Sequence, residues 1–147
     1  MSPFFKDTVA IHAPVGVVWN SLTHIESMQA WMGDPEMKVE VETQWNVGGP
    51  MVVRGFHHMP FENRGVVLKF EPQKTLSYTH LSSLSHLPDQ PQSYTTFEFS
   101  LDPAGHDTSL TLVASHFPTL SIFKHLQFYW TGTLRVLKQH AERRGSC

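Results

Sequence analysis

Hydrophobic and polar residues alternate along most of this chain with the two-residue period of strands that are buried on one face. In residues 36–45, Met37, Val39, Val41 and Trp45 alternate with polar or charged residues. The same period predicts further strands at residues 6–13, 51–56, 64–71, 75–81, 95–101 and 110–116. A solvent-exposed face and a buried face on each strand indicate an antiparallel sheet of about seven strands.

Three segments show helical spacing instead. A short helix is predicted directly after Pro14, because the first turn of a helix tolerates proline. A second short helix is predicted from Ile25 to Met32, and a long amphipathic helix from about Thr119 to Arg144. Its apolar stripe contains Phe123, Leu126, Tyr129, Trp130, Leu134, Leu137 and Ala141. One strand, two short helices, six strands and one long helix together predict an α+β fold.

Length and composition narrow the classes of protein. The chain has 147 residues, of which 40% are hydrophobic and 16% charged, so we expect a single domain over residues 1–147 with a sizeable core. A net charge of -2 gives no basic surface for nucleic acid. No segment approaches 18 apolar residues and the N-terminus lacks a signal-peptide pattern, so we expect a cytoplasmic protein without a membrane span. The only cysteine is Cys147, which excludes an intramolecular disulfide.

Several stretches together resemble one protein family. They are IHAPVGVVWNSLT, MQAWMGD, the Gly48-Gly49 pair, GVVLKFEPQKTLSYT, TTFEFSLDPAGHDTSLTL and FYWTGTLRVLKQHAE, and they cover nearly the whole chain. In this order they are similar to the homologues of the activator of heat-shock protein 90 ATPase. That family belongs to the START-like (SRPBCC) superfamily, which has the helix-grip fold of the birch pollen allergen. One departure is Tyr129-Trp130, where the family often has Gly-Trp.

The resemblance implies a curved antiparallel sheet wrapped around the long C-terminal helix. It also implies a cavity between them for a small hydrophobic or amphipathic ligand, which would be lipid-like, aromatic or polyketide-like. An enzyme of the polyketide cyclase or hydrolase kind that uses a cavity histidine is one alternative. A co-chaperone-like regulator of an ATPase chaperone is another, although the chain lacks the additional N-terminal domain of the eukaryotic activators. A homodimer and a protein partner stay open.

The strand phases place Tyr78, His80 and His116 on apolar sheet faces. A few polar groups within hydrophobic walls are typical of a small-molecule site, although each could instead be a hydrogen-bonded core residue or lie at a strand end. Trp31 and Trp130 are expected to flank the mouth of the pocket. The full set predicted to contact the ligand is Trp31, Tyr78, His80, Phe97, Phe99, Leu112, His116, Phe123, Leu126, Trp130 and Leu134.

Catalytic and metal chemistry have weaker support. His80 and His116 are the candidates for acid–base chemistry, and Glu98 and Arg54 are weaker ones. The chain contains no nucleophile-elbow or His-Glu-x-x-His pattern, so we expect no metal and no cofactor. The pair His57-His58 cannot bind one ion from a regular strand, because adjacent side chains point to opposite faces.

Two glycine- or proline-bearing segments are expected to be loops. Gly48-Gly49 lies between strands and predicts a hairpin turn instead of a phosphate-binding loop. Residues 82–92 are polar and contain Pro88 and Pro91, so we expect them to form a mobile gate beside the pocket.

Overall fold

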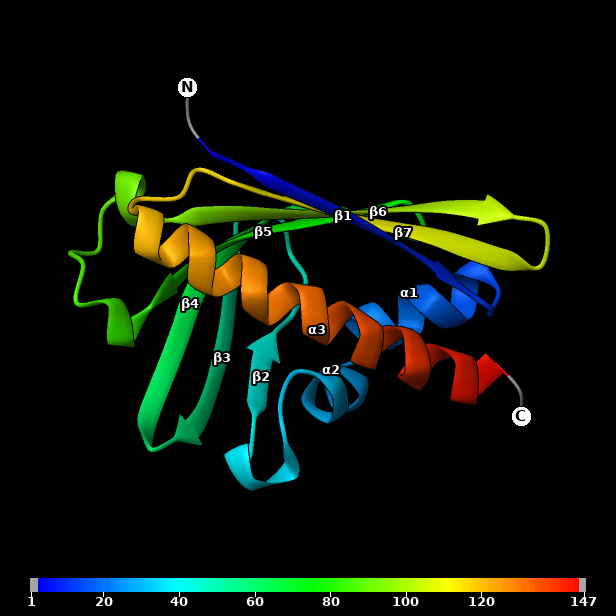
Figure 1. The fold of residues 1–147 in the computed structure, drawn as a ribbon, viewed down its shortest axis with the longest axis horizontal. Helices are drawn as coiled ribbons and strands as arrows, with labels where there is room; N and C mark the ends of the chain where they lie inside the picture. Colours follow the sequence, from blue (N-terminus) through cyan, green and yellow to red (C-terminus); the bar gives the residue numbers. More distant parts are fainter. Residues whose placement is uncertain (1–2, 146–147) are drawn as a thin grey trace.

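The computed structural model describes residues 3–145 (Figure 1). Cys147 lies outside the described residues. The strands are β1 (Phe5–Ile11), β2 (Glu40–Thr43), β3 (Pro50–His57), β4 (Met59–Glu71), β5 (Thr75–Ser82), β6 (Thr95–Ala104) and β7 (Asp107–Ser115). The α-helices are α1 (Val15–Thr23), α2 (Ile25–Trp31) and α3 (Leu120–Gly145), and the 3₁₀ helices are η1 (Pro35–Met37), η2 (Ser83–Ser85) and η3 (Pro91–Ser93).

The strands form one antiparallel sheet in the order β1-β7-β6-β5-β4-β3-β2. The long helix α3 crosses one face of this sheet, and α1 and α2 lie beside its second half (Figure 1). The predicted α+β helix-grip fold is therefore confirmed.

Helix α3 is fixed by a cap and by contacts along its length. The Thr119 hydroxyl accepts a hydrogen bond from the Ile122 amide at 3.1 Å, which satisfies one of the free donors at the helix start. Further along, the Arg135 guanidinium pairs with the Asp7 carboxylate on β1 at 2.7 Å. The Glu142 carboxylate accepts the His12 amide at 2.9 Å. The helix is thus tied to β1 and to the segment that follows β1.

The sheet face under α3 is apolar, as alternation requires. Phe97, Phe99, Leu110 and Leu112 are at most 1% exposed. Their neighbours on the same strands, such as Glu98 and Val113, face the opposite side of the sheet by the register of β6 with β7. Burying this face against α3 supplies the hydrophobic driving force for the fold.

Residues 36–45 differ from the predicted strand. Pro35–Met37 form η1, and only Glu40–Thr43 pair with β3. Lys38 and Trp45 adopt positive φ angles of 49° and 56°, which end the extended conformation on either side. The alternation still marks burial correctly, because Val39 and Val41 are both 8% exposed.

The hairpin of β3 and β4 is longer than predicted. Its strands run to His57 and from Met59, and His58 makes the turn with a φ of 65°. This turn brings the rings of His57 and His58 to 4.5 Å between centroids, which a regular strand would prevent. At the other end of the sheet, β7 ends at Ser115 because His116 has a φ of 62°.

Candidate functional site

Aromatic side chains fill the space between the sheet and α3. The Trp130 ring lies edge-on to Phe97 and Phe99, with centroids 5.4 and 5.6 Å apart. Tyr78 meets the same two phenyl rings at 5.6 and 6.0 Å. The residues predicted to wall a central cavity therefore contact one another and form an aromatic floor.

Most of the predicted ligand contacts lie in this buried layer. Trp31 is 2% exposed and donates its indole N–H to the Ser21 carbonyl at 2.8 Å, so the prediction that it flanks the mouth is wrong. Trp130, the other residue expected to flank the mouth, is likewise buried, with only 4% of its surface exposed. Leu112 and Leu134 are fully buried, and Leu126 is 6% exposed.

Two predicted residues lie away from the rest. His116 is exposed, and its imidazole is within 3.2 Å of the Thr96 hydroxyl on the outer side of the strand end. The prediction that His116 projects into the apolar interior is therefore wrong, and its left-handed backbone is the reason. Phe123 packs against Phe117 and Phe5 at 5.0 and 6.3 Å, on the β1 side of α3.

His80 lies where the sheet face becomes accessible. Its half-buried imidazole packs against Phe97 with centroids 5.3 Å apart. Burial, and to a smaller extent the imidazole of His125 on α3, lowers the pKa of His80 to about 4. The ring is consequently neutral near pH 7 and can donate and accept one hydrogen bond each.

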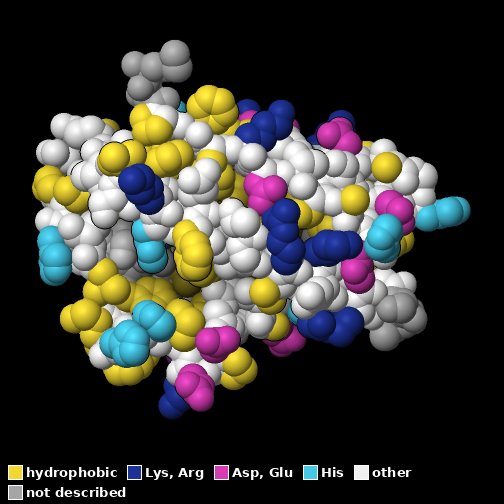
Figure 2. All heavy atoms as spheres, in the orientation of Figure 1, with side chains coloured by type: hydrophobic (Ala, Val, Ile, Leu, Met, Phe, Trp, Pro, Cys, Tyr) yellow, Lys and Arg dark blue, Asp and Glu magenta, His cyan; other side chains and the backbone are white. Residues whose placement is uncertain are grey.

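The surface between α3 and the hairpin of β3 and β4 is hollowed. Figure 2 shows a depression between the first half of α3 and the hairpin of β3 and β4, with hydrophobic side chains along both rims and histidines beside them. Met59, which pairs with His57 on the same face of the hairpin as Val53 and Asn63, is 52% exposed. We call this depression the hairpin groove.

The wall of the hairpin groove contains residues that were not predicted from the sequence. On the hairpin, the Phe61 ring covers Gly55, where an added Cβ would lie 2.7 Å from the ring. Asn63 and Val53 are paired neighbours on the same face and are half-buried. Phe61 and Asn63 precede Arg64, where the predicted strand began, and Val53 lies in the strand predicted at residues 51–56, to which no site residue was assigned. A Gly opposite an aromatic residue is the signal that could have found them.

A second depression lies at the other end of the molecule. Its volume is about 320 Å³, and its lining is Thr23, His24, Ile25, Glu26, Ser27, Trp45 and Arg144. None of the predicted site residues lines it. The exposed side chains of His24, Glu26 and Arg144 make it a wide surface cleft with charges of both signs.

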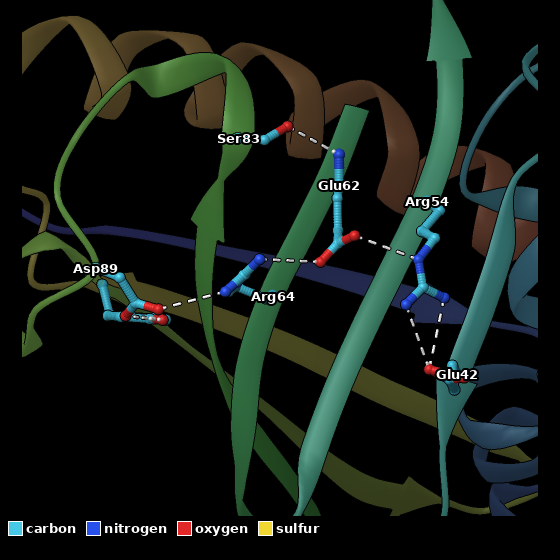
Figure 3. Close-up of polar contacts among 7 residues, drawn as sticks. Glu42, Arg54, Glu62, Arg64, Ser83 and Asp89 are labelled. Atoms are coloured by element: carbon cyan, nitrogen blue, oxygen red, sulfur yellow. Dashed lines mark hydrogen bonds and ion pairs between the residues drawn. The ribbon is translucent and has the colours of Figure 1, made fainter. Parts of the chain in front are cut away.

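Charged residues gather on the opposite face of the sheet. Arg54 pairs with Glu42 and Glu62, and Glu62 also pairs with Arg64 (Figure 3). The row continues into the loop after β5, where Asp89 lies 3.4 Å from the Arg64 guanidinium. Because the alternation sends these charges away from α3, the groove face stays apolar.

The loop predicted to be a mobile gate is held by several bonds. Besides the Arg64 contact, Asp89 accepts the Tyr94 hydroxyl at 2.6 Å. The Ser83 hydroxyl accepts the Glu62 amide at 2.9 Å, and Ser82 caps η2 through the Leu84 amide. The loop also contains η2 and η3, so it has more local structure than its composition suggested.

Within residues 3–145, no three His, Cys, Asp or Glu side chains gather as a metal site would require. No helix in that part of the chain has the length and apolar character needed to cross a membrane.

Comparison with known proteins agrees with this architecture. A family described as "Activator of Hsp90 ATPase homolog 1-like protein" matches residues 12–142. Among solved structures, protein ChR145 from Cytophaga hutchinsonii is 25% identical with a TM-score of 0.79, over 99% of this chain and 97% of that chain. Protein CV1439 from Chromobacterium violaceum has a TM-score of 0.82 at 17% identity, over 95% and 96%. The Aha1 dimer from Colwellia psychrerythraea has a TM-score of 0.75 at 19% identity, over 95% and 96%. No curated protein sequence matches the chain.

Proposed function

The chain belongs to the family of activator of Hsp90 ATPase homolog 1-like proteins, and we propose that it binds a small hydrophobic or amphipathic molecule in the hairpin groove. The observation that carries this proposal is the position of His80. This half-buried polar side chain packs on Phe97 of the aromatic floor and lies near His125 in the first half of α3, the helix segment that borders the depression. Hydrophobic walls with a few placed polar groups are the usual composition of a small-molecule site.

The aromatic floor restricts where such a molecule can lie. Phe97, Phe99 and Trp130 already fill the space below the middle of α3. A ligand therefore lies between the first half of α3 and the hairpin, in contact with Phe61 and Val53. Met59, which is 52% exposed and pairs with His57 on the groove face of the hairpin, would close over it from the rim.

The geometry does not favour acid–base catalysis as the main function. A general base works best with a pKa near the working pH, whereas the pKa of His80 is lowered to about 4. The other predicted base, His116, is exposed beside Thr96 and away from the groove. Ligand binding therefore explains the position of His80 better than catalysis does.

Binding is tested with Nile red, an uncharged dye whose fluorescence rises in apolar surroundings. We expect the native protein to raise the fluorescence and Val53→Trp to abolish the rise, because a larger side chain on the groove face fills the space. Val52→Trp is the matched control. Val52 is also half-buried, but it lies on the face of the sheet away from the groove, with its strand partners Glu42 and Arg64. No rise with the native protein, or an equal loss in both variants, would contradict the proposal.

A further inference from the structure

The sheet face that lines the groove carries almost no charge. The register and alternation of the seven strands place one charged residue on the face toward α3, and this is Asp7. Its carboxylate is already paired with Arg135 at 2.7 Å. The arginines of β3 and β4 lie on the opposite face with their acidic partners (Figure 3). A charged ligand group in the groove would find no strand residue of opposite charge to pair with.

Tyr78 supplies a buried hydrogen-bond donor on this face. The residue is 4% exposed, and its ring lies among Phe97, Phe99 and Trp45. Among residues 3–145 its hydroxyl makes no hydrogen bond, whereas the nearby Tyr129 hydroxyl donates to the Met32 carbonyl. An unpaired hydroxyl in an apolar site is costly, on a scale comparable to a lost hydrogen bond.

The Tyr78 hydroxyl is not completely enclosed. In the described part of the chain, the only fully enclosed side-chain polar atom without a partner is the Ser21 hydroxyl oxygen. The Tyr78 oxygen is therefore not fully enclosed, although the residue as a whole is only 4% exposed. A ligand acceptor that reaches this oxygen can take its hydrogen bond.

Two further uncharged polar groups follow on the same face. The His80 imidazole, two residues along β5 from Tyr78, makes no hydrogen bond within residues 3–145. The register, with Arg64 opposite Leu81 and Val67 opposite Tyr78, puts Gly65 across from His80, so no side chain fills that position. The half-buried amide of Asn63 is likewise without a hydrogen bond in the described part of the chain.

We propose that the ligand of the hairpin groove is an uncharged, largely apolar molecule with a carbonyl oxygen, such as a ketone or an ester, that accepts the Tyr78 hydroxyl. His80 and Asn63 supply hydrogen bonds to a second neutral polar group of the ligand. A carboxylate, as in a fatty acid, is disfavoured against the sheet, because the strands offer no cation to pair with it and burying an unpaired charge costs more than burying a hydrogen-bonded carbonyl. This inference rests on the proposed function, since it names the ligand class of the same groove.

Three probes of the same shape separate the alternatives: 2-acetylnaphthalene, 2-naphthoate and 2-ethylnaphthalene. They present a neutral carbonyl, a carboxylate and no acceptor. We expect the native protein to bind the ketone about threefold to tenfold more tightly than the ethyl compound, the range of one neutral hydrogen bond. We expect the carboxylate to bind more weakly than the ketone. Binding is followed by equilibrium titration with protein NMR.

Tyr78→Phe should reduce the preference for the ketone over the ethyl compound to less than about twofold, while binding of the ethyl compound stays unchanged. Tyr94→Phe is the matched control, because the Tyr94 hydroxyl is engaged with Asp89 outside the groove. Equal binding of all three probes, tighter binding of the carboxylate, or an unchanged preference in Tyr78→Phe overturns the inference and leaves the proposed function standing. Absence of binding for all three overturns the proposed function as well.

Discussion

The imidazole of His80 packs against the phenyl ring of Phe97, with ring centroids 5.3 Å apart. The contact joins a titratable side chain at the edge of the hairpin groove to the aromatic floor. It holds the imidazole in surroundings that disfavour its charged form. His80 should therefore report on the groove through the pH dependence of stability.

The His80 contact predicts a loss of stability in mild acid. The pKa of His80 is about 4 in the folded protein and about 6.5 in an unfolded chain. Between these values the unfolded state binds the proton and the folded state does not, so stability falls as the pH drops from about 6.5 to 4 and is unaffected by this group above about 7. The difference corresponds to at most about 3 kcal/mol, and solvent at the half-buried ring reduces it to about 1–2 kcal/mol.

The measurement is urea unfolding of the native protein and of His80→Leu between pH 4.5 and 7.5. The stability of His80→Leu relative to the native protein should rise as the pH falls. His116→Leu, at an exposed histidine, should give a curve parallel to that of the native protein. The lowered pKa of His140 acts in all three proteins and cancels in the comparison. A constant difference between His80→Leu and the native protein across this range would show that His80 is not held neutral.

Two aromatic residues on α3 should differ sharply in their contribution to stability. Trp130 is 4% exposed and contacts Trp31, Phe97 and Phe99, whereas Phe128 is 85% exposed. Trp130→Ala should lower the free energy of unfolding by about 3–5 kcal/mol through lost contacts and a cavity. Phe128→Ala should change it by less than about 0.5 kcal/mol. Comparable losses in the two variants would mean that the aromatic floor is not packed as described.

Glycine substitutions test the close approach of β4 and β5. A Cβ at Gly65 would lie 1.8 Å from the Thr79 carbonyl oxygen, whereas a Cβ at Gly132 in α3 meets nothing within 4 Å. Gly65→Ala should destabilise the protein by about 1–3 kcal/mol or more, because the strands must separate. Gly132→Ala should stabilise it by about 0.5–1 kcal/mol, because alanine is the better helix former. Thermal unfolding should show a lower melting temperature for Gly65→Ala and a higher one for Gly132→Ala. An unchanged melting temperature in Gly65→Ala would contradict the close spacing of β4 and β5.

Local periodicity was sufficient to predict the sheet and the long helix. The strand at Thr95–Ala104 and the helix at Leu120–Gly145 are signalled by their own residues. Residues 36–45 show where this signal fails. The Trp45 indole donates to the Thr23 carbonyl at 2.8 Å, a bond between residues far apart in sequence, and the backbone at Trp45 turns to a φ of 56°. Strand propensity carries no information about such a contact.

The site was predicted only in part, for the same reason. The phase of β5 correctly placed Tyr78 and His80 on one face, because that relation is local. The neighbours that make the groove, His125 on α3 and Phe61 on the hairpin, depend on how far the hairpin reaches and where α3 crosses it. The reach of the hairpin is set by the turn at His58. That turn has a positive φ at a residue other than glycine, which the sequence does not signal.

The loop after β5 gives a last prediction, because one carboxylate connects it to the sheet. Asp89 contacts both Arg64 on β4 and the Tyr94 hydroxyl just before β6. Asp89→Ala should leave global stability within about 1 kcal/mol, as is usual for exposed ion pairs. Amide hydrogen exchange in residues 83–93 should nevertheless become several-fold faster. Without the Asp89 carboxylate these contacts are absent, so local opening of the loop costs less free energy. Asp102→Ala, at an exposed position near the end of β6, is the control and should leave exchange in the loop unchanged.

The same exchange experiment decides whether this loop gates the groove. If it does, Nile red should slow exchange in residues 83–90 of the native protein, and Asp89→Ala should speed dye association, because a released loop opens more often. If it is only a surface loop, the dye should slow exchange in β3, β4 and α3 alone, and the association rate should match that of Asp102→Ala. The bonds from Ser83, Asp89 and Tyr94 hold the loop to the sheet in either case. Exchange must therefore be measured in both Asp89→Ala and Asp102→Ala. The loop is a gate only if breaking these contacts limits the rate at which the dye enters the groove.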